Sequence, residues 1–87
     1  MKEIIYPNGE TLDFETKKEK PSLKELQKAV GGYIELVQLL DGNIMIINEE
    51  GKLNDLEPNH VATEKAFPKG GDIIVGNAVV LSPELMI

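Results

Sequence analysis

The dipeptide Asp41-Gly42, which separates two apolar segments, constrains the fold of this chain more than any other feature. Asp-Gly favours a two-residue hairpin turn, because both residues tolerate the positive φ angles of a type I′ turn. We therefore predict antiparallel strands over residues 33–40 and 43–48, with Glu35 directly opposite Asn48. Both faces of this hairpin are then largely apolar, so we expect other parts of the protein, or a second subunit, to cover both sides.

A second hairpin is predicted over residues 4–14, around the loop Pro7-Asn8-Gly9. Proline presets φ for the first loop position and glycine supplies the left-handed residue of a bulged three-residue loop. This register places Ile4 opposite Leu12 and sets Tyr6 and Phe14 on one side. The charged residues 15–20 then form a connector.

Two short helices are expected. Ser22 and Glu25 have the spacing of a capping box before an apolar periodicity, and Gly31-Gly32 ends the first helix. The residues predicted on its buried face are Leu23, Leu26, Ala29 and Val30. A second helix is predicted over residues 58–67, with Val61, Ala62 and Ala66 buried and Pro68 as its stop.

The remaining segments are read from glycines and isolated apolar residues. Residues 49–52 are predicted to turn with a positive φ at Gly51, followed by Leu53 and Leu56 as anchors. A last strand is predicted over residues 72–81, interrupted at Gly76-Asn77. The apolar tail of residues 85–87 is expected to dock on the domain.

Together these elements predict an α+β fold in the order β-β-α-β-β-α-β. Short hairpins favour antiparallel pairing, so we expect an antiparallel or mixed sheet of about five strands with two short helices. We predict that residues 1–87 form a single domain. A chain this short buries a limited core, and a homodimer would be a natural supplement.

Charge and composition exclude several classes of function. The net charge is −6 and all nine basic residues are lysine, which makes direct nucleic-acid binding unfavourable and suits a basic protein partner. There is no cysteine and one histidine, so we predict no metal site and no cofactor. No apolar run approaches the ~20 residues of a membrane span, and residues 1–4 lack a signal-peptide core, which favours the cytoplasm.

Catalysis has little support in the residue inventory. His60 is the only imidazole, Thr63 follows it at helical spacing, and we expect His60 to face solvent. Glu35 with Glu49 or Glu50 could hold Mg²⁺ or Ca²⁺ or act as an acid–base pair, but no metal-loop spacing accompanies them. We therefore assign no catalytic residue and predict that the protein is not an enzyme.

Polar residues and glycines at the ends of the predicted strands form the candidate binding site. The candidate ligand- or partner-binding residues are Glu35, Asn48, Glu49, Glu50, Gly51, Asn59, Gly76 and Asn77. If they converge at one edge of the sheet, they suit a partner or a small polar, nucleotide-like ligand. The alternative is that the asparagine side chains satisfy loop backbone groups internally.

Several of these motifs occur together in a known family. The motifs are Tyr33-Ile34-Glu35, the strands around Asp41-Gly42, residues 48–53, Pro58-Asn59 with Ala62-Thr63, and residues 72–80. Over residues 21–81 the chain resembles small domains of unknown function carried mainly by bacteriophages, prophages and other mobile elements. The N-terminal hairpin and connector, residues 1–20, and the tail, residues 82–87, then flank this family-like core.

The resemblance implies a context and no activity. We expect a non-enzymatic phage or mobile-element accessory protein that binds a protein partner in the cytoplasm of a bacterial host. A protein that binds or sequesters a small nucleotide-like ligand is the alternative, and a small hydrolase is the third hypothesis.

Overall fold

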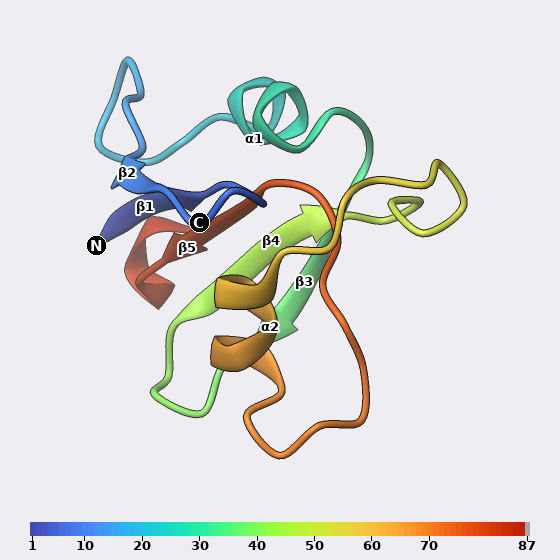
Figure 1. The fold of residues 1–87 in the computed structure, drawn as a ribbon. Coiled ribbons are helices and arrows are strands. Elements are labelled where there is room, and N and C mark those ends of the chain that lie inside the picture. Colours follow the sequence, from blue (N-terminus) through green and yellow to red (C-terminus); the bar gives the residue numbers. More distant parts are fainter. Residues whose placement is uncertain (87) are drawn as a thin grey trace.

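The computed structural model describes residues 1–86, which form one five-stranded antiparallel sheet in the order β2-β1-β5-β4-β3 (Figure 1). The strands are β1 Lys2–Ile5, β2 Thr11–Asp13, β3 Ile34–Gln38, β4 Ile44–Asn48 and β5 Ala78–Leu81. The helices are α1 Leu23–Val30, α2 His60–Ala66 and the short 3₁₀ helix η1 Pro83–Leu85. The predicted α+β class and element order are confirmed.

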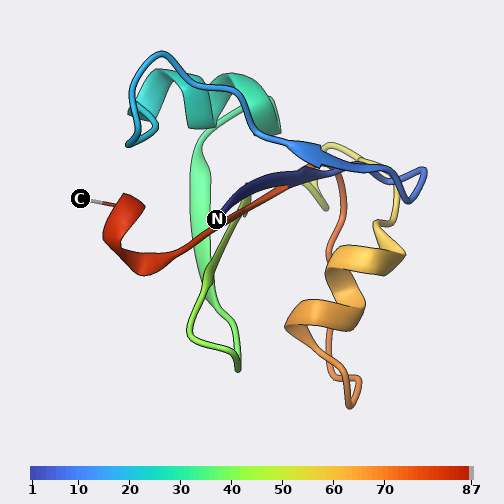
Figure 2. The same ribbon diagram turned by 90° about the vertical axis from the view of Figure 1, so that its left-hand side faces the viewer.

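The two faces of the sheet carry different elements, and each has its own core. Figure 2 shows α1 and η1 on one side of the strands and α2 on the other. The α1-side core contains Ile4, Leu26, Val30, Ile46, Val79, Leu81 and Leu85. The α2-side core contains Ile5, Leu39, Met45, Ala62, Ile74, Ala78 and Val80. The expectation that both faces of the 33–48 hairpin are covered is therefore correct for β4, whereas in the edge strand β3 Glu35, Leu36 and Gln38 are exposed.

The N-terminal hairpin has the predicted register, with Ile4 opposite Leu12. Its loop closes through the Tyr6 N–H, which donates to the Glu10 carbonyl over 2.8 Å, and Gly9 has a φ of +94°. β1 lies inside the sheet because its other side pairs with β5. The hairpin is thus a structural part of the same sheet.

Helix α1 begins with the predicted capping box. The Glu25 N–H donates to Ser22 Oγ over 3.1 Å, and the Ser22 N–H donates to Glu25 Oε1 over 2.8 Å. Gly31 ends the helix in the left-handed conformation. The predicted burial of Leu23 is wrong, since this side chain is 57% exposed. Helical spacing predicts on which face of the helix the Leu23 side chain lies, but it does not predict whether the sheet extends beneath the first turn of the helix.

The predicted register of the β3–β4 hairpin is wrong by one residue. Glu35 pairs with Ile47 and Ile34 pairs with Asn48, so Glu35 and Asn48 lie on opposite faces of the sheet. The cause is the loop, which contains residues 40–42 in place of the predicted two: the Leu39 N–H donates to the Asn43 carbonyl over 3.0 Å. Changing a hairpin loop by one residue changes every cross-strand partner.

Two predictions for the segment after β4 are also wrong. Gly51 does not have a positive φ; it is buried, and a Cβ there would lie 2.8 Å from Val75 Cγ2. Close approach of the two segments therefore explains the glycine. Leu53 is 82% exposed and is no anchor, whereas Leu56 is partly buried against Gly76.

The C-terminal part is less regular than predicted. α2 starts at His60 after the N-cap Asn59, and its Val61 is exposed while Ala62 is fully buried. β5 begins only at residue 78, because Gly76 has a φ of +78° and the preceding residues make a single bridge, Pro58 to Val75.

The predicted docking of the tail is correct for the residues that the structure describes. Leu85 is buried in the α1-side core, and Met86 packs against that core. Ile87, the last residue of the predicted tail, lies outside the described residues.

Candidate functional site

Asn48, the last residue of β4, and Asn77, the residue before β5, both bind the carboxyl end of α1. Asn48 Nδ2 donates to the Val30 carbonyl over 3.0 Å, and Asn77 Nδ2 donates to the Ala29 carbonyl over 3.0 Å. The last carbonyls of a helix have no partner within it, so these amides satisfy groups that the helix leaves open. Asn48 Oδ1 also accepts from the Glu50 N–H over 2.8 Å, which fixes the loop after β4.

Asn59 is fully buried and joins three parts of the chain. Its Nδ2 donates to the carbonyls of Ile5 over 3.0 Å and Gly76 over 2.8 Å. Its Oδ1 accepts from the Ala62 N–H over 3.1 Å and so caps α2. All hydrogen-bonding atoms of this side chain are therefore used inside the protein.

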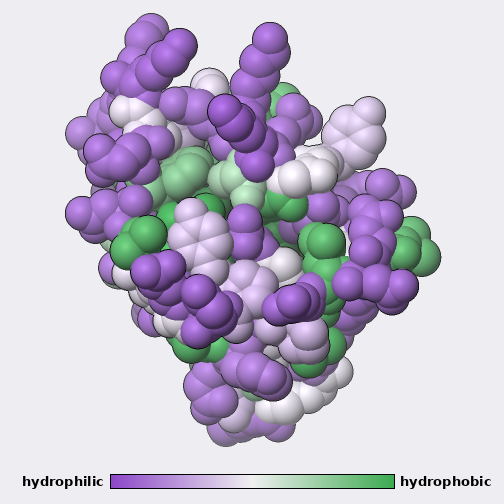
Figure 3. All heavy atoms as spheres, turned by 45° about the horizontal axis from the view of Figure 1, so that its top comes forward, coloured by the Kyte–Doolittle hydropathy of each residue, from purple (hydrophilic) through white to green (hydrophobic). Residues whose placement is uncertain are grey.

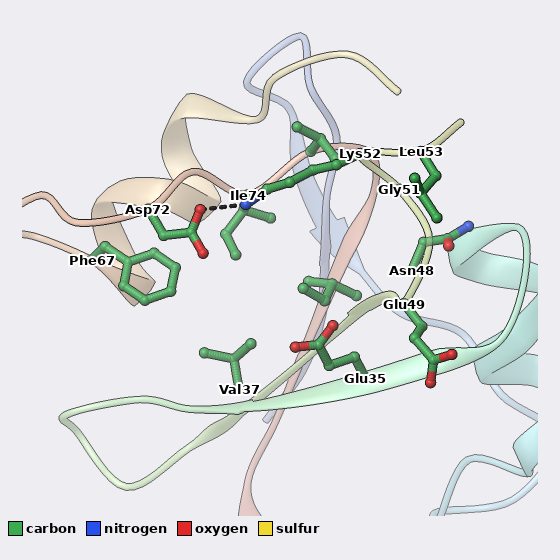
Figure 4. Close-up of a pocket in the computed structure, with 12 residues that line it drawn as sticks. Glu35, Val37, Asn48, Glu49, Gly51, Lys52, Leu53, Phe67, Asp72 and Ile74 are labelled. Atoms are coloured by element: carbon green, nitrogen blue, oxygen red, sulfur yellow. Dashed lines mark hydrogen bonds and ion pairs between the residues drawn. The ribbon is translucent and has the colours of Figure 1, made fainter. Parts of the chain in front are cut away.

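The eight candidate residues do not meet in one place. Glu35, Glu49 and Gly51 line one hollow, together with Asn48, whose amide points away toward α1 (Figure 4). A second hollow is lined by Gly76 and Asn77 with residues of the first hairpin and α1. Asn59 lies buried beneath α2, and Glu50 is exposed in the loop after β4.

The first hollow lies on the α2 side of the sheet, between β3 and two loops. It has a volume of about 150 Å³. Its apolar wall consists of Val37, Ile47, Leu53, Phe67, Ile74 and Val75. Figure 4 shows the Glu35 carboxylate directed toward this space, and in residues 1–86 that carboxylate makes no hydrogen bond or ion pair within the protein.

Lys52 and Asp72 form an ion pair across the rim of the same hollow (Figure 4). The hydrogen bond from Lys52 lowers the pKa of the Asp72 carboxyl, and the Ile73 N–H lowers it further. This pair joins the loop after β4 to the segment that follows α2. Sequence reasoning missed Lys52, Phe67 and Asp72, because only the three-dimensional arrangement brings these loops together.

A second feature with binding potential is the free edge of the sheet. β3 is the last strand in the sheet order, and within residues 1–86 no strand pairs with its outer side. Hydrogen bonds from Glu49 N–H to the Tyr33 carbonyl and from Leu39 N–H to the Asn43 carbonyl show which residues face β4. Because antiparallel strands alternate, the backbone groups of residues 34, 36 and 38 point outward.

Apolar side chains surround this open edge. Tyr33 is 69% exposed, Leu36 51% and Leu40 87%. The opposite edge, β2, is only three residues long and carries Thr11 and Asp13 beside Leu12. The α1-bearing face, seen in Figure 3, is mostly hydrophilic with small separate apolar areas. The β3 edge therefore combines free backbone groups with exposed apolar side chains.

The described residues offer little for metal or nucleophilic chemistry. No group of three or more His, Asp or Glu in residues 1–86 is placed to hold a metal ion. His60 is exposed at the start of α2, while the Thr63 hydroxyl accepts from the Ile74 N–H over 2.8 Å and donates to the Asn59 carbonyl over 2.8 Å. Among the same residues, no helix is long and apolar enough to cross a membrane.

Comparison with known proteins places the chain in a family without assigning it an activity. No curated protein and no solved structure matches it significantly. One family model matches, that of a domain of unknown function (DUF3846), and the match covers residues 1–85. The matched region includes the N-terminal hairpin as well as the motifs between residues 21 and 81. The chain therefore belongs to the DUF3846 family of domains of unknown function.

Proposed function

We propose that this chain is a non-enzymatic accessory protein of a bacteriophage or other mobile element, and that it binds a protein partner through the outer edge of β3 in the cytoplasm of a bacterial host. The open edge of β3 with its exposed apolar side chains is the observation that carries the proposal. The motif resemblance described above supports the mobile-element context.

An open strand edge is a template for another strand. Its unpaired N–H and C=O groups pair readily with an extended segment, and proteins usually protect such edges with charges, proline or short strands. β3 has five residues and no proline, and its one charged residue is Glu35; the positions whose backbone groups face outward, Ile34, Leu36 and Gln38, carry no charge. A partner strand would satisfy these groups and cover Leu36 at the same time.

Around Glu35, the geometry gives little support to the small-ligand alternative. Small-molecule sites usually have volumes of about 300–1,000 Å³. The hollow beside Glu35 is smaller, at about 150 Å³. The amides of Asn48, Asn59 and Asn77, which would have recognised such a ligand, bind backbone carbonyls instead.

The test uses two proline substitutions at opposite edges of the sheet. Leu36→Pro removes an outward-facing N–H of β3, and Asp13→Pro is the matched control, because hydrogen bonds on either side of residue 13 show that its N–H faces outward from β2. A partner captured from host lysate is identified, purified and titrated against all three proteins. We expect Leu36→Pro to weaken binding at least about tenfold, and Asp13→Pro to leave it unchanged.

Thermal unfolding of both variants shows whether the sheet is intact. Equal affinity of the wild type and a folded Leu36→Pro variant for the partner would overturn the proposal. A nucleotide or sugar that raises the melting temperature, with no effect of Leu36→Pro, would favour the ligand alternative.

A further inference from the structure

We infer, on the basis of the proposed function, that the segment bound at β3 alternates apolar and basic residues, and that one lysine or arginine side chain of this segment occupies the hollow beside Glu35.

The register of the sheet decides where the side chains of an added strand would point. Glu35 and Ile47 pair directly and lie on the α2 side, which is the side of the hollow. The backbone of Glu35 faces β4, so a residue opposite it on an added strand forms a non-hydrogen-bonded pair with it. In such a pair the Cβ atoms lie about 4.5–5.5 Å apart on the same face. The side chain opposite Glu35 therefore points toward the hollow.

The charged residues in the β3–β4 hairpin and directly after it are all negative. Residues 33–50 contain Glu35, Asp41, Glu49 and Glu50 and no basic residue. Lys52, the basic residue that lines the hollow, is already paired with Asp72. A basic side chain on the added strand would give the Glu35 carboxylate the partner that it lacks within residues 1–86.

The same charges argue against a second copy of this chain at the edge. Pairing two β3 strands would bring two hairpins together that each carry four acidic and no basic residues. The whole chain also carries a net charge of −6. Repulsion between like charges therefore favours a basic partner over self-association.

The lining of the hollow fits a long basic side chain. Val37, Phe67 and Ile74 offer apolar surface, and Glu35 lies at the strand edge. Lysine and arginine bury their aliphatic stems on apolar surface while the charged group stays at a polar site. An aromatic ring adds a favourable contact for a cation. A volume of about 150 Å³ suits one side chain rather than a complete ligand.

The other face of the edge selects the alternate residues. Leu36 pairs with Ile46 and lies on the α1 side, where it is 51% exposed. A residue opposite Leu36 on the added strand would point to this side and would bury apolar surface best if it were apolar itself. The expected segment therefore reads apolar-basic-apolar over at least three residues.

The experiment uses defined peptides and the full chain. The probe is a capped seven-residue peptide that alternates valine and arginine; the comparison peptides alternate valine and glutamate, or carry the arginines and valines in separate blocks. Binding is followed by amide chemical shifts. We expect the alternating basic peptide to shift the signals of β3 and of the hollow, and to bind at least tenfold more tightly than either comparison peptide.

Charge substitutions locate the basic side chain. Glu35→Gln should weaken binding of the basic peptide at least fivefold. Glu10→Gln, which removes the same charge from the exposed loop before β2, should change it less than twofold. Glu35→Lys should reverse the preference toward the glutamate peptide.

The outcomes separate the two proposals. If Leu36→Pro abolishes peptide binding but Glu35→Gln and Glu10→Gln behave alike, the inference about the hollow is overturned and edge binding stands. If no alternating peptide binds, the inference is overturned, while the response of the natural partner to Leu36→Pro still decides the proposed function. Sedimentation showing a dimer that Leu36→Pro dissociates would overturn both.

Discussion

At the scale of single residues, the buried asparagine Asn59 joins three parts of the chain. Its side-chain amide holds β1, the segment before β5 and the start of α2 through three hydrogen bonds, and the side chain is fully buried. Its backbone carbonyl also accepts from the Thr63 hydroxyl. Position 59 is therefore a point at which local and long-range structure depend on one side chain.

We predict that Asn59→Ala lowers the free energy of unfolding by about 2–4 kcal/mol. The substitution leaves the carbonyls of Ile5 and Gly76 without their donor, at a cost of about 1–3 kcal/mol, and removes an N-cap worth about 0.5–2 kcal/mol. Urea unfolding measures the change. Asn54→Ala, at an exposed position, is the matched control and should alter stability by less than about 0.5 kcal/mol. Similar midpoints for the two variants would contradict this role.

The roles of the polar residues were only partly predictable from the sequence. Internal use of asparagine was one of two readings, and the structure shows it for Asn48, Asn59 and Asn77. The sequence does not reveal which distant carbonyl an amide will reach. Nor does it show that Gly51 is required by a neighbouring segment, because Val75 lies 24 positions away along the chain.

At the scale of elements, the ion pair of Lys52 and Asp72 links the loop after β4 to the segment after α2. Both segments border the hollow beside Glu35. The pKa of Asp72 is below its ordinary value in the folded protein because Lys52, and then the Ile73 N–H, donate to the carboxylate. The pair therefore stabilises the closure of these loops only while Asp72 is ionised.

We predict that Lys52→Met raises the pKa of Asp72 toward its ordinary value. Because the folded pKa is the lower one, the stabilisation is fully present above the unfolded pKa and is lost as the pH falls through the folded pKa. The stability difference between the wild type and Lys52→Met should therefore shrink on acidification. Carboxyl carbon NMR titration and urea unfolding across pH measure both effects. Lys69→Met, at an exposed lysine, serves as the control; an Asp72 titration unchanged by Lys52→Met would refute the link.

Element types were predictable, whereas loop lengths and registers were less so. The capping box of Ser22 and Glu25 is a local signal and was confirmed atom by atom. The Asp41-Gly42 signal placed the hairpin correctly, but Leu40 also belongs to the loop, and the register moved by one residue. In the observed register, Asn48 and Glu35 lie on opposite faces of the sheet. The turn preference of a dipeptide does not determine how many of its neighbouring residues lie in the loop rather than in the paired strands.

At the scale of the whole molecule, β5 lies in the centre of the sheet and contributes to both cores. Leu81 is fully buried on the α1 side and Val80 is 2% exposed on the α2 side. A domain of 87 residues is expected to be stable by roughly 4–13 kcal/mol, at about 0.05–0.15 kcal/mol per residue. A single defect in this strand is therefore large relative to the total.

We predict that Leu81→Ala lowers the free energy of unfolding by about 2–5 kcal/mol, because it opens a cavity in the α1-side core. Leu53→Ala is the matched control, since Leu53 is 82% exposed and should change stability by less than about 0.5 kcal/mol. Urea unfolding measures the free energy of unfolding of both variants, with the same dependence on urea concentration used for each. A loss at position 81 no larger than the loss at position 53 would show that β5 is not central to the stability of the domain.

The central position of β5 has a consequence for the synthesis of the protein. Within residues 1–86 the β1–β2 and β3–β4 hairpins do not pair with each other, and β5, the last strand of this range, pairs with both. Isolated two-stranded hairpins are at best marginally stable in water. During translation the complete sheet therefore cannot form until residues 78–81 are available to pair with both β1 and β4.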